Sequence, residues 1–115
     1  MVRKKEEQRI EFKNIRGGIG EVEMQKILNG PDEMFGKGRM FCRMIVPPGH
    51  TLGLHSHEGD NEIFYVLSGS GVYHDNGETV VLKPGDTAVC KDGENHAMEN
   101  VGDEPLQMIA LILYS

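Results

Sequence analysis

Four side chains of types that commonly bind metals lie at defined spacings in two segments of the 115-residue chain. The first segment has the pattern Gly49-x5-His55-x-His57-x4-Glu62-x6-Gly69. The second has the pattern Gly85-x7-Gly93-x2-His96-x3-Asn100. Imidazole and carboxylate groups are the ligands that many divalent transition metals take in proteins. The sequence therefore predicts one divalent metal per chain, bound by His55, His57, Glu62 and His96.

The elements that must position these ligands read as β-strands. Successive side chains of a strand point to opposite faces, so His55 and His57 are expected to point the same way. Glu62 follows a polar stretch at 58–61 that is expected to form a turn and return it to the same side. His96 is distant in sequence, as expected if the chain closes on itself.

Short runs between Gly- and Pro-containing turns are expected to form strands throughout the chain. Asn76-Gly77 between two apolar runs is a strong hairpin signal. Many short strands separated by turns predict an all-β sandwich or barrel over residues 20–115. Residues 1–19 are expected to form an N-terminal arm that is partly disordered or exchanged with a partner subunit. The expected strands are 21–28, 39–46, 52–57, 63–67, 71–74, 79–82, 87–90, 96–100 and 106–114.

The composition limits the classes of partner and the compartment. A formal net charge of -6 argues against nucleic acid and against anionic membrane surfaces. No apolar run reaches the roughly 20 residues of a membrane-spanning helix. The charged segment 1–9 has no apolar run behind it, so a signal peptide is not expected and the cytoplasm is the predicted compartment. Cys42 and Cys90 are then expected to be reduced thiols.

Together, the two glycine-bounded motifs resemble those of the cupin family, in particular its small single-domain members. One departure is Lys91, where the family pattern usually has proline. The resemblance implies a double-stranded β-helix, also called a jelly roll. It implies metal binding by the same two motifs, with manganese or iron favoured and nickel, zinc, cobalt or copper as alternatives. A dioxygenase, an oxalate-decarboxylase-like enzyme and a non-catalytic binding protein all occur in this family.

Alternation also predicts which residues line a cavity beside the metal. Phe64 lies two residues beyond Glu62, and Met98 lies two beyond His96, so both should share the face of the ligands. Cys42, Met44 and Met108 belong to apolar faces of their strands and are expected to close the wall. Each of these residues is equally well explained as ordinary core. Cys42 in particular is favoured as a small buried hydrophobe over a reactive thiol.

Cationic side chains that could bind an anionic ligand beside the metal are scarce on this interpretation. Arg39 and Arg43 lie on the strand face opposite Met40 and Met44, so they are expected to point outward. Lys91, in the loop before His96, is the best candidate. Arg16 could reach the site only if the N-terminal segment folds over it.

The sequence favours an enzyme acting on a small polar molecule at the metal, with dioxygenation or decarboxylation of oxalate-like acids as the expected chemistry. Four protein ligands would leave an octahedral metal two positions for substrate, oxygen or water. The alternative is a non-catalytic protein that binds or senses a small ligand. Both faces of 39–46 and 106–114 carry apolar residues, which predicts burial against a second copy in a homodimer.

Overall fold

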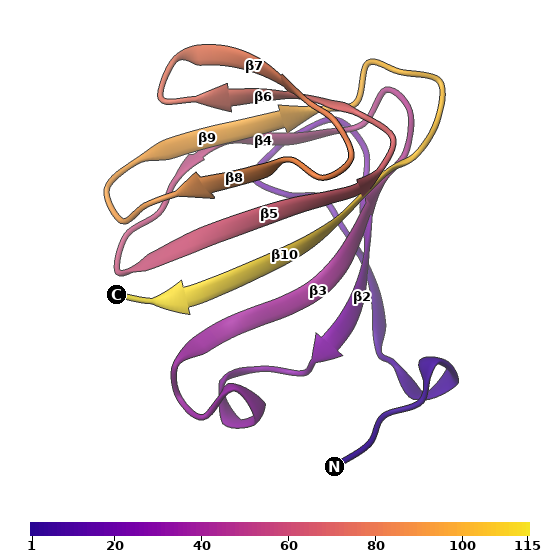
Figure 1. The fold of residues 1–115 in the computed structure, drawn as a ribbon, viewed down its shortest axis with the longest axis vertical. Helices are drawn as coiled ribbons and strands as arrows, with labels where there is room; N and C mark the ends of the chain where they lie inside the picture. Colours follow the sequence, from indigo (N-terminus) through magenta and orange to yellow (C-terminus); the bar gives the residue numbers. More distant parts are fainter.

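The computed structural model describes all residues from Met1 to Ser115 and consists almost entirely of antiparallel strands (Figure 1). The two helical segments, η1 (Lys5–Glu7) and η2 (Pro31–Met34), are short 3-10 turns, neither long nor apolar enough to cross a membrane. The strands are β1 (Ile10–Lys13), β2 (Val22–Leu28), β3 (Gly38–Val46), β4 (Thr51–Ser56), β5 (Asp60–Ser68), β6 (Gly71–Asp75), β7 (Glu78–Leu82), β8 (Thr87–Cys90), β9 (Asn95–Glu99) and β10 (Leu106–Tyr114).

Two sheets face each other and enclose the core. The larger sheet has the order β1-β2-β3-β10-β5-β8, and the smaller has the order β4-β9-β6-β7. From β3 to β10 the chain passes back and forth between the sheets, apart from the hairpin of β6 and β7 within the smaller sheet, and so winds as the double-stranded β-helix that the family resemblance implied (Figure 1). Inward residues of both sheets form one cluster of 17 buried side chains, including Met44, Phe64 and Met108. Burial alternates strictly along β3 and β10, which fixes their register against one another.

The strands agree closely with those expected from the sequence, with one consequence for the site. Every predicted end falls within one residue of the observed one except the start of β5, which is Asp60 and not residue 63. The turn before β5 is therefore shorter than expected, and Asp60 is a buried strand residue. β1 was not predicted, because its alternating residues Ile10 and Phe12 remain largely exposed and carry no core signal.

The N-terminal segment packs on its own barrel. β1 pairs antiparallel with β2, and Arg3 forms an ion pair with Glu33 of η2 over 2.6 Å. The loop 14–20 that follows β1 lies against β4. Its Ile15 carbonyl accepts a hydrogen bond from Gly53 N–H over 3.0 Å, and its Ile19 carbonyl accepts one from Thr51 N–H over 3.0 Å. The loop thus lies beside the strand that carries His55.

Candidate metal centre

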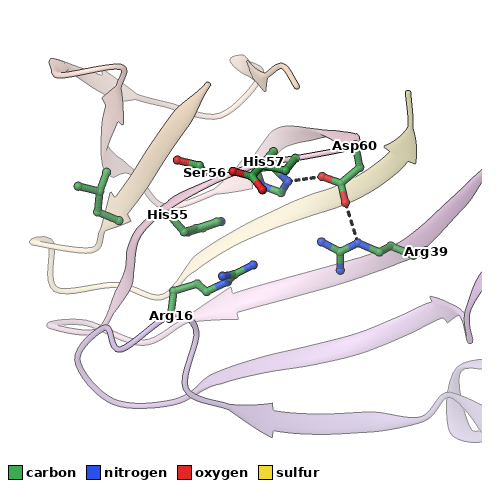
Figure 2. Close-up of a pocket in the computed structure, with 8 residues that line it drawn as sticks. Arg16, Arg39, His55, Ser56, His57 and Asp60 are labelled. Carbon is green, nitrogen blue, oxygen red and sulfur yellow. Dashed lines mark hydrogen bonds and ion pairs between the residues drawn. The ribbon is translucent and has the colours of Figure 1, made fainter. Parts of the chain in front are cut away.

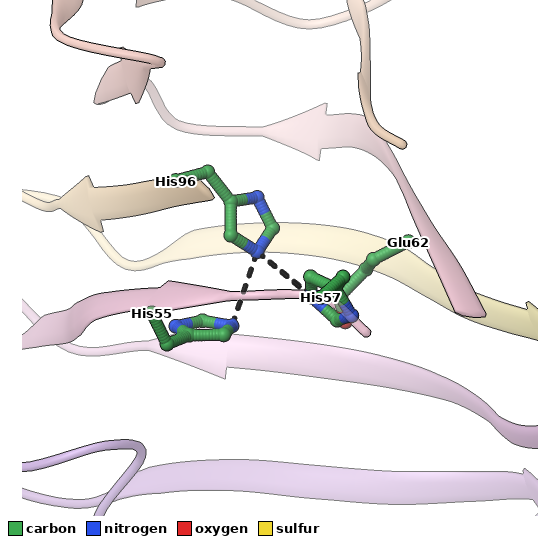
Figure 3. Close-up of side chains that lie close together, drawn as sticks. All are labelled: His55, His57, Glu62 and His96. Atoms are coloured by element: carbon green, nitrogen blue, oxygen red, sulfur yellow. Dashed lines mark hydrogen bonds and ion pairs between the residues drawn. The ribbon is translucent and has the colours of Figure 1, made fainter. Parts of the chain in front are cut away.

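Three strands of the two sheets bring the four predicted ligands together. His55 lies in β4 and is paired directly with His96 of β9. His57 lies one residue beyond the end of β4, and Glu62 projects from β5 in the opposite sheet. One ligand atom from each of the four residues falls within 4.8 Å of the others. Figure 3 shows the three imidazole rings and the carboxylate converging on one point inside the barrel.

The nitrogens and the oxygen at this point are so close to one another that a proton or a metal ion must lie between the atoms of each contact. Nε2 of His96 lies 3.1 Å from Nε2 of His55 and 3.2 Å from Nε2 of His57. Oε1 of Glu62 lies 3.1 Å from Nε2 of both His57 and His96. His57, Glu62 and His96 are at most 5% exposed, so water screens these contacts little. A cation between the atoms would relieve the repulsion of their lone pairs.

The second nitrogen of each imidazole has its own partner. Nδ1 of His55 donates to the carbonyl oxygen of Gly53 over 2.7 Å, and Nδ1 of His57 donates to Asp60 over 2.7 Å. Nδ1 of His96 lies 2.8 Å from the buried hydroxyl of Tyr73. A carbonyl and a carboxylate only accept, so in the neutral rings of His55 and His57 the lone pair is on Nε2 and faces the cluster. This second set of contacts is typical of histidines that bind metals.

The ionisation of the cluster follows from burial and pairing. Burial opposes ionisation of Glu62, but hydrogen bonds that His57 and His96 donate through Nε2 when their rings are protonated hold the pKa of its carboxyl below the usual value. Hydrogen bonding to Glu62, and then to Asp60, raises the pKa of His57 against the effect of burial. Burial lowers the pKa of His55. Glu62 is therefore an anion at neutral pH, as a metal ligand must be.

The donor set suits a single divalent metal. Three Nε2 atoms and one carboxylate oxygen converge, two rings are held in the required tautomer, and the ligands come from both sheets of a rigid barrel. Borderline donors of this kind accommodate most late first-row ions as well as manganese and iron. His55, His57, Glu62 and His96 would hold the ion.

A small internal cavity of about 140 Å³ opens beside the cluster. His55, His57 and Glu62 form one side of it. The opposing wall is apolar and consists of Ile15, Met24, Met40, Met44, Leu52, Phe64 and Ile112. Phe64 also stacks on the ring of His96, with the two planes 10° apart and the centroids 5.3 Å apart. The cavity would admit only a small molecule next to the metal.

The mouth of the cavity is polar and carries two arginines. It widens into an open pocket of about 630 Å³ that includes Arg16, Arg39, His55, His57 and Asp60. Figure 2 shows Arg16 and Arg39 directed toward the space beside the histidines from two sides. Nε of Arg39 donates to Oδ2 of Asp60 over 2.8 Å, while Arg16 has no hydrogen bond or ion pair within the protein. The mouth therefore offers a ligand the unpaired guanidinium group of Arg16 and the two free terminal nitrogens of Arg39.

The structure places the predicted cavity residues in different surroundings. Met44 and Phe64 line the cavity. Cys42, Met98 and Met108 are fully buried but lie outside its lining. Met108 pairs with Met44 across the sheet, and a side chain at Gly71 would collide with the sulfur of Met98. Alternation predicts which face of a strand a side chain is on, but not how far along the barrel it lies. These three side chains therefore share the inner face with the cluster but pack in the core away from the cavity.

The cationic residues are distributed differently from the sequence expectation. Lys91 is exposed in the loop after β8 and lines neither the cavity nor its mouth. Arg39 occupies an exposed position of β3, as expected, but its side chain also lines the mouth, which was not expected. Arg39 is the second residue of β3, and its long side chain reaches over the edge of the strand to Asp60. Arg16 reaches the mouth because the N-terminal loop does fold over β4.

Sequence reasoning missed two residues that contact the ligands, Asp60 and Tyr73. Asp60 was assigned to a turn, although its position three residues after His57 could have indicated a partner for that ring. Tyr73 lies on β6, which is paired with β9, so its hydroxyl reaches His96 across two neighbouring strands. No local pattern near Tyr73 points to this contact.

Comparison with known proteins agrees with the fold and the ligand pattern. The family model described as a cupin domain matches residues 42–112. The chain is 49% identical over 100 residues to the oxalate-binding protein of Thermotoga maritima, covering 87% of this chain and 82% of that one. A crystal structure from T. maritima, described as a predicted oxalate decarboxylase, has a TM-score of 0.93 at 45% identity and covers 100% of both chains. A Klebsiella pneumoniae protein with a double-stranded β-helix domain has a TM-score of 0.70 at 27% identity, covering 87% of this chain and 83% of that one. The chain belongs to the cupin family.

Proposed function

We propose that this protein binds manganese or iron through His55, His57, Glu62 and His96, and holds a small dicarboxylate of the oxalate type beside the metal. The observation that carries the proposal is the combination of a buried three-histidine, one-carboxylate cluster with a small cavity whose mouth contains two arginines. The relative named for oxalate binding supports the same class of ligand.

The charges around the cavity also favour a dianion. The cationic residues that line the cavity and its mouth are Lys13, Arg16 and Arg39, and the acidic ones are Glu58, Asp60 and Glu62. These six charges cancel, so a divalent metal leaves two positive charges in a partly enclosed site. Ion pairing is stronger where water is excluded, and a dicarboxylate would neutralise the site. A neutral ligand would leave this excess charge uncompensated.

A bound divalent metal would supply a Lewis acid that attracts carboxylate oxygens. The protein contributes the rest of the recognition. Phe64 and the methionines of the wall make one side of the cavity apolar, while Arg39 is held in place by Asp60. Guanidinium groups recognise carboxylates with two parallel hydrogen bonds, which gives orientation as well as affinity.

Isothermal titration calorimetry tests this function directly. Protein stripped with a chelator and reloaded with manganese(II) is titrated with oxalate, next to stripped protein and a manganese-treated H55A/H57A variant. We expect binding close to one oxalate per chain only in the loaded protein. Manganese-loaded protein that shows no oxalate binding would overturn the proposal.

Catalysis at the same site is the second candidate, and one residue favours it. Loss of carbon dioxide from oxalate leaves a carbon that must take up a proton to give formate, so a decarboxylase needs a proton donor beside the ligand. Asp60 and Glu62 are already paired with cationic or imidazole groups. Glu58 lines the mouth and has no side-chain partner, so in its protonated form it is the acid that we propose as the donor of that proton.

We further propose that the protein acts in the cytoplasm as a homodimer that binds neither nucleic acid nor membranes. The outer face of the larger sheet supports the dimer, because Tyr65, Leu67 and Val89 are each 37–44% exposed there. Exchange of residues 1–19 between the two copies stays a prediction. Light scattering at micromolar concentration should give twice the 12.8 kDa chain mass, and a monomeric mass would contradict this proposal.

A further inference from the structure

The loop 14–20 holds Arg16 in an unusual conformation that directs its side chain to the cavity mouth. Arg16 has a φ of 53°, in the left-handed region, and is followed by Gly17 with a φ of 73°. Residues other than glycine adopt this region rarely, and they keep it only where the surroundings enforce it. Such conformations often occur at sites that bind ligands, so the contacts that enforce this one are informative.

Close backbone packing enforces the conformation. A Cβ atom at Gly53 would collide with the carbonyl oxygen of Arg16, and one at Gly18 would collide with that of Thr51. Asn14 fastens the same loop, since its side chain accepts from Gly17 N–H over 3.0 Å and donates to the Gly18 carbonyl over 2.7 Å. The loop thus lies directly on the β4 segment that precedes His55.

The guanidinium group delivered by this loop is free to bind. Arg16 makes no hydrogen bond or ion pair inside the protein, although it lines both the cavity and its mouth. Arg39 approaches the same space and uses only Nε for Asp60, so its terminal nitrogens are also unpaired. A tightly packed loop that presents an unpaired guanidinium group at the mouth of a cavity is suited to bind an anion there.

We infer that Arg16 and its loop make the site selective for dicarboxylates over other small chelating acids. The inference rests on the proposed function, since it assumes a carboxylate ligand at the metal. Oxalate and glycolate can each chelate a metal through two oxygens. In oxalate both chelating oxygens belong to carboxylates, so two further carboxylate oxygens point away from the metal, whereas glycolate has only one. Arg16, held by the packed loop, binds those outer oxygens together with Arg39.

The selectivity is measured by titrating manganese-loaded wild type, R16A and R16K with oxalate and with glycolate. Loss of a charge-assisted hydrogen-bonded pair should weaken oxalate binding by roughly 10- to 100-fold in R16A. Glycolate binding should weaken by a smaller factor than oxalate binding, because chelated glycolate keeps only one outer carboxylate oxygen and oxalate keeps two. R16K keeps the positive charge but not the planar, two-pronged guanidinium group, so its oxalate affinity should lie between those of wild type and R16A. K91A is the matched control and should behave as wild type.

Two further measurements separate a clamp from a simple surface charge. G18A displaces the loop while keeping the guanidinium, so it should lose oxalate affinity as R16A does, with its fold checked by circular dichroism. Oxalate should slow amide hydrogen exchange of residues 14–20 in wild type but not in R16A. Equal oxalate affinity in R16A and wild type would overturn the inference, as would equal losses for oxalate and glycolate. Wild type that binds no oxalate would instead overturn the proposed function.

Discussion

The carboxylate of Asp60 accepts a hydrogen bond from Nδ1 of His57 over 2.7 Å, and so determines which nitrogen of that imidazole faces the metal cluster. The other oxygen of Asp60 accepts from Nε of Arg39 over 2.8 Å. Burial opposes the negative charge, but these two bonds hold the pKa of the Asp60 carboxyl below its usual value. One buried carboxylate thereby connects a proposed metal ligand, His57, to the guanidinium of Arg39 at the cavity mouth.

Replacing Asp60 should weaken metal binding although Asp60 does not belong to the cluster. In D60N the charge that orients and polarises His57 is lost, and changes of this kind typically lower metal affinity by about 10- to 100-fold. Equilibrium dialysis with manganese(II) measures the affinity directly. D103N changes an exposed acid outside the site and should have no effect. Unchanged affinity in D60N would contradict the role assigned to Asp60.

Removing the metal should lower the thermal stability of the fold. An ion present at 100 times its dissociation constant stabilises the native state by about 2.7 kcal/mol. In a domain of this size, that corresponds to a decrease in Tm of roughly 10 °C when a chelator is added. The H55A/H57A variant should melt at the same temperature with and without chelator. A wild-type Tm that does not change when the chelator is added would contradict metal binding at this site.

The convergence of the four predicted ligands and the positions of most strands could be predicted from the sequence, because both depend on short-range patterns. The spacing of His55 and His57 determines a shared face, and the turn residues bound the strands within one residue at nearly every end. The residues that line the mouth depend instead on contacts between segments that are distant in sequence. The alternation of side chains along the strand correctly placed Arg39 on the outer face. It could not show that, at the end of the strand, the long side chain reaches over the edge to Asp60. Arg16 lies at the mouth because its loop packs against β4 at Gly18 and Gly53, which are 35 positions apart.

If the protein is an oxalate decarboxylase, Glu58 should be needed for turnover and not for binding. E58Q keeps the shape of the side chain but cannot donate a proton, so formate release from manganese-loaded protein should fall by about 100-fold or more. Oxalate affinity, measured by titration calorimetry, should stay within about threefold of wild type. Turnover that persists in E58Q would exclude this proton donor. Wild type that binds oxalate without releasing formate would favour the binding function.

Both cysteines should be unreactive in the native protein. Burial is the main cause that raises the pKa of the Cys42 thiol to about 12 and that of Cys90 to about 11. Iodoacetamide reacts with the thiolate, so at pH 8 it should label neither residue until the protein unfolds. Unfolded thiols ionise near pH 9 and folded ones only above it, so the native state binds more protons in this interval. The free energy of unfolding should therefore fall as the pH rises above about 9. Rapid labelling of native protein at pH 8 would contradict the buried placement.

The central claim is that these four residues bind a divalent metal, and elemental analysis tests it most directly. The protein is purified without chelator or a metal-affinity tag, next to the H55A/H57A variant prepared in the same way. We expect about one manganese or iron per wild-type chain and none in the variant. Folded wild type that contains no metal, and takes none up from added manganese(II) or iron(II), would contradict the claim.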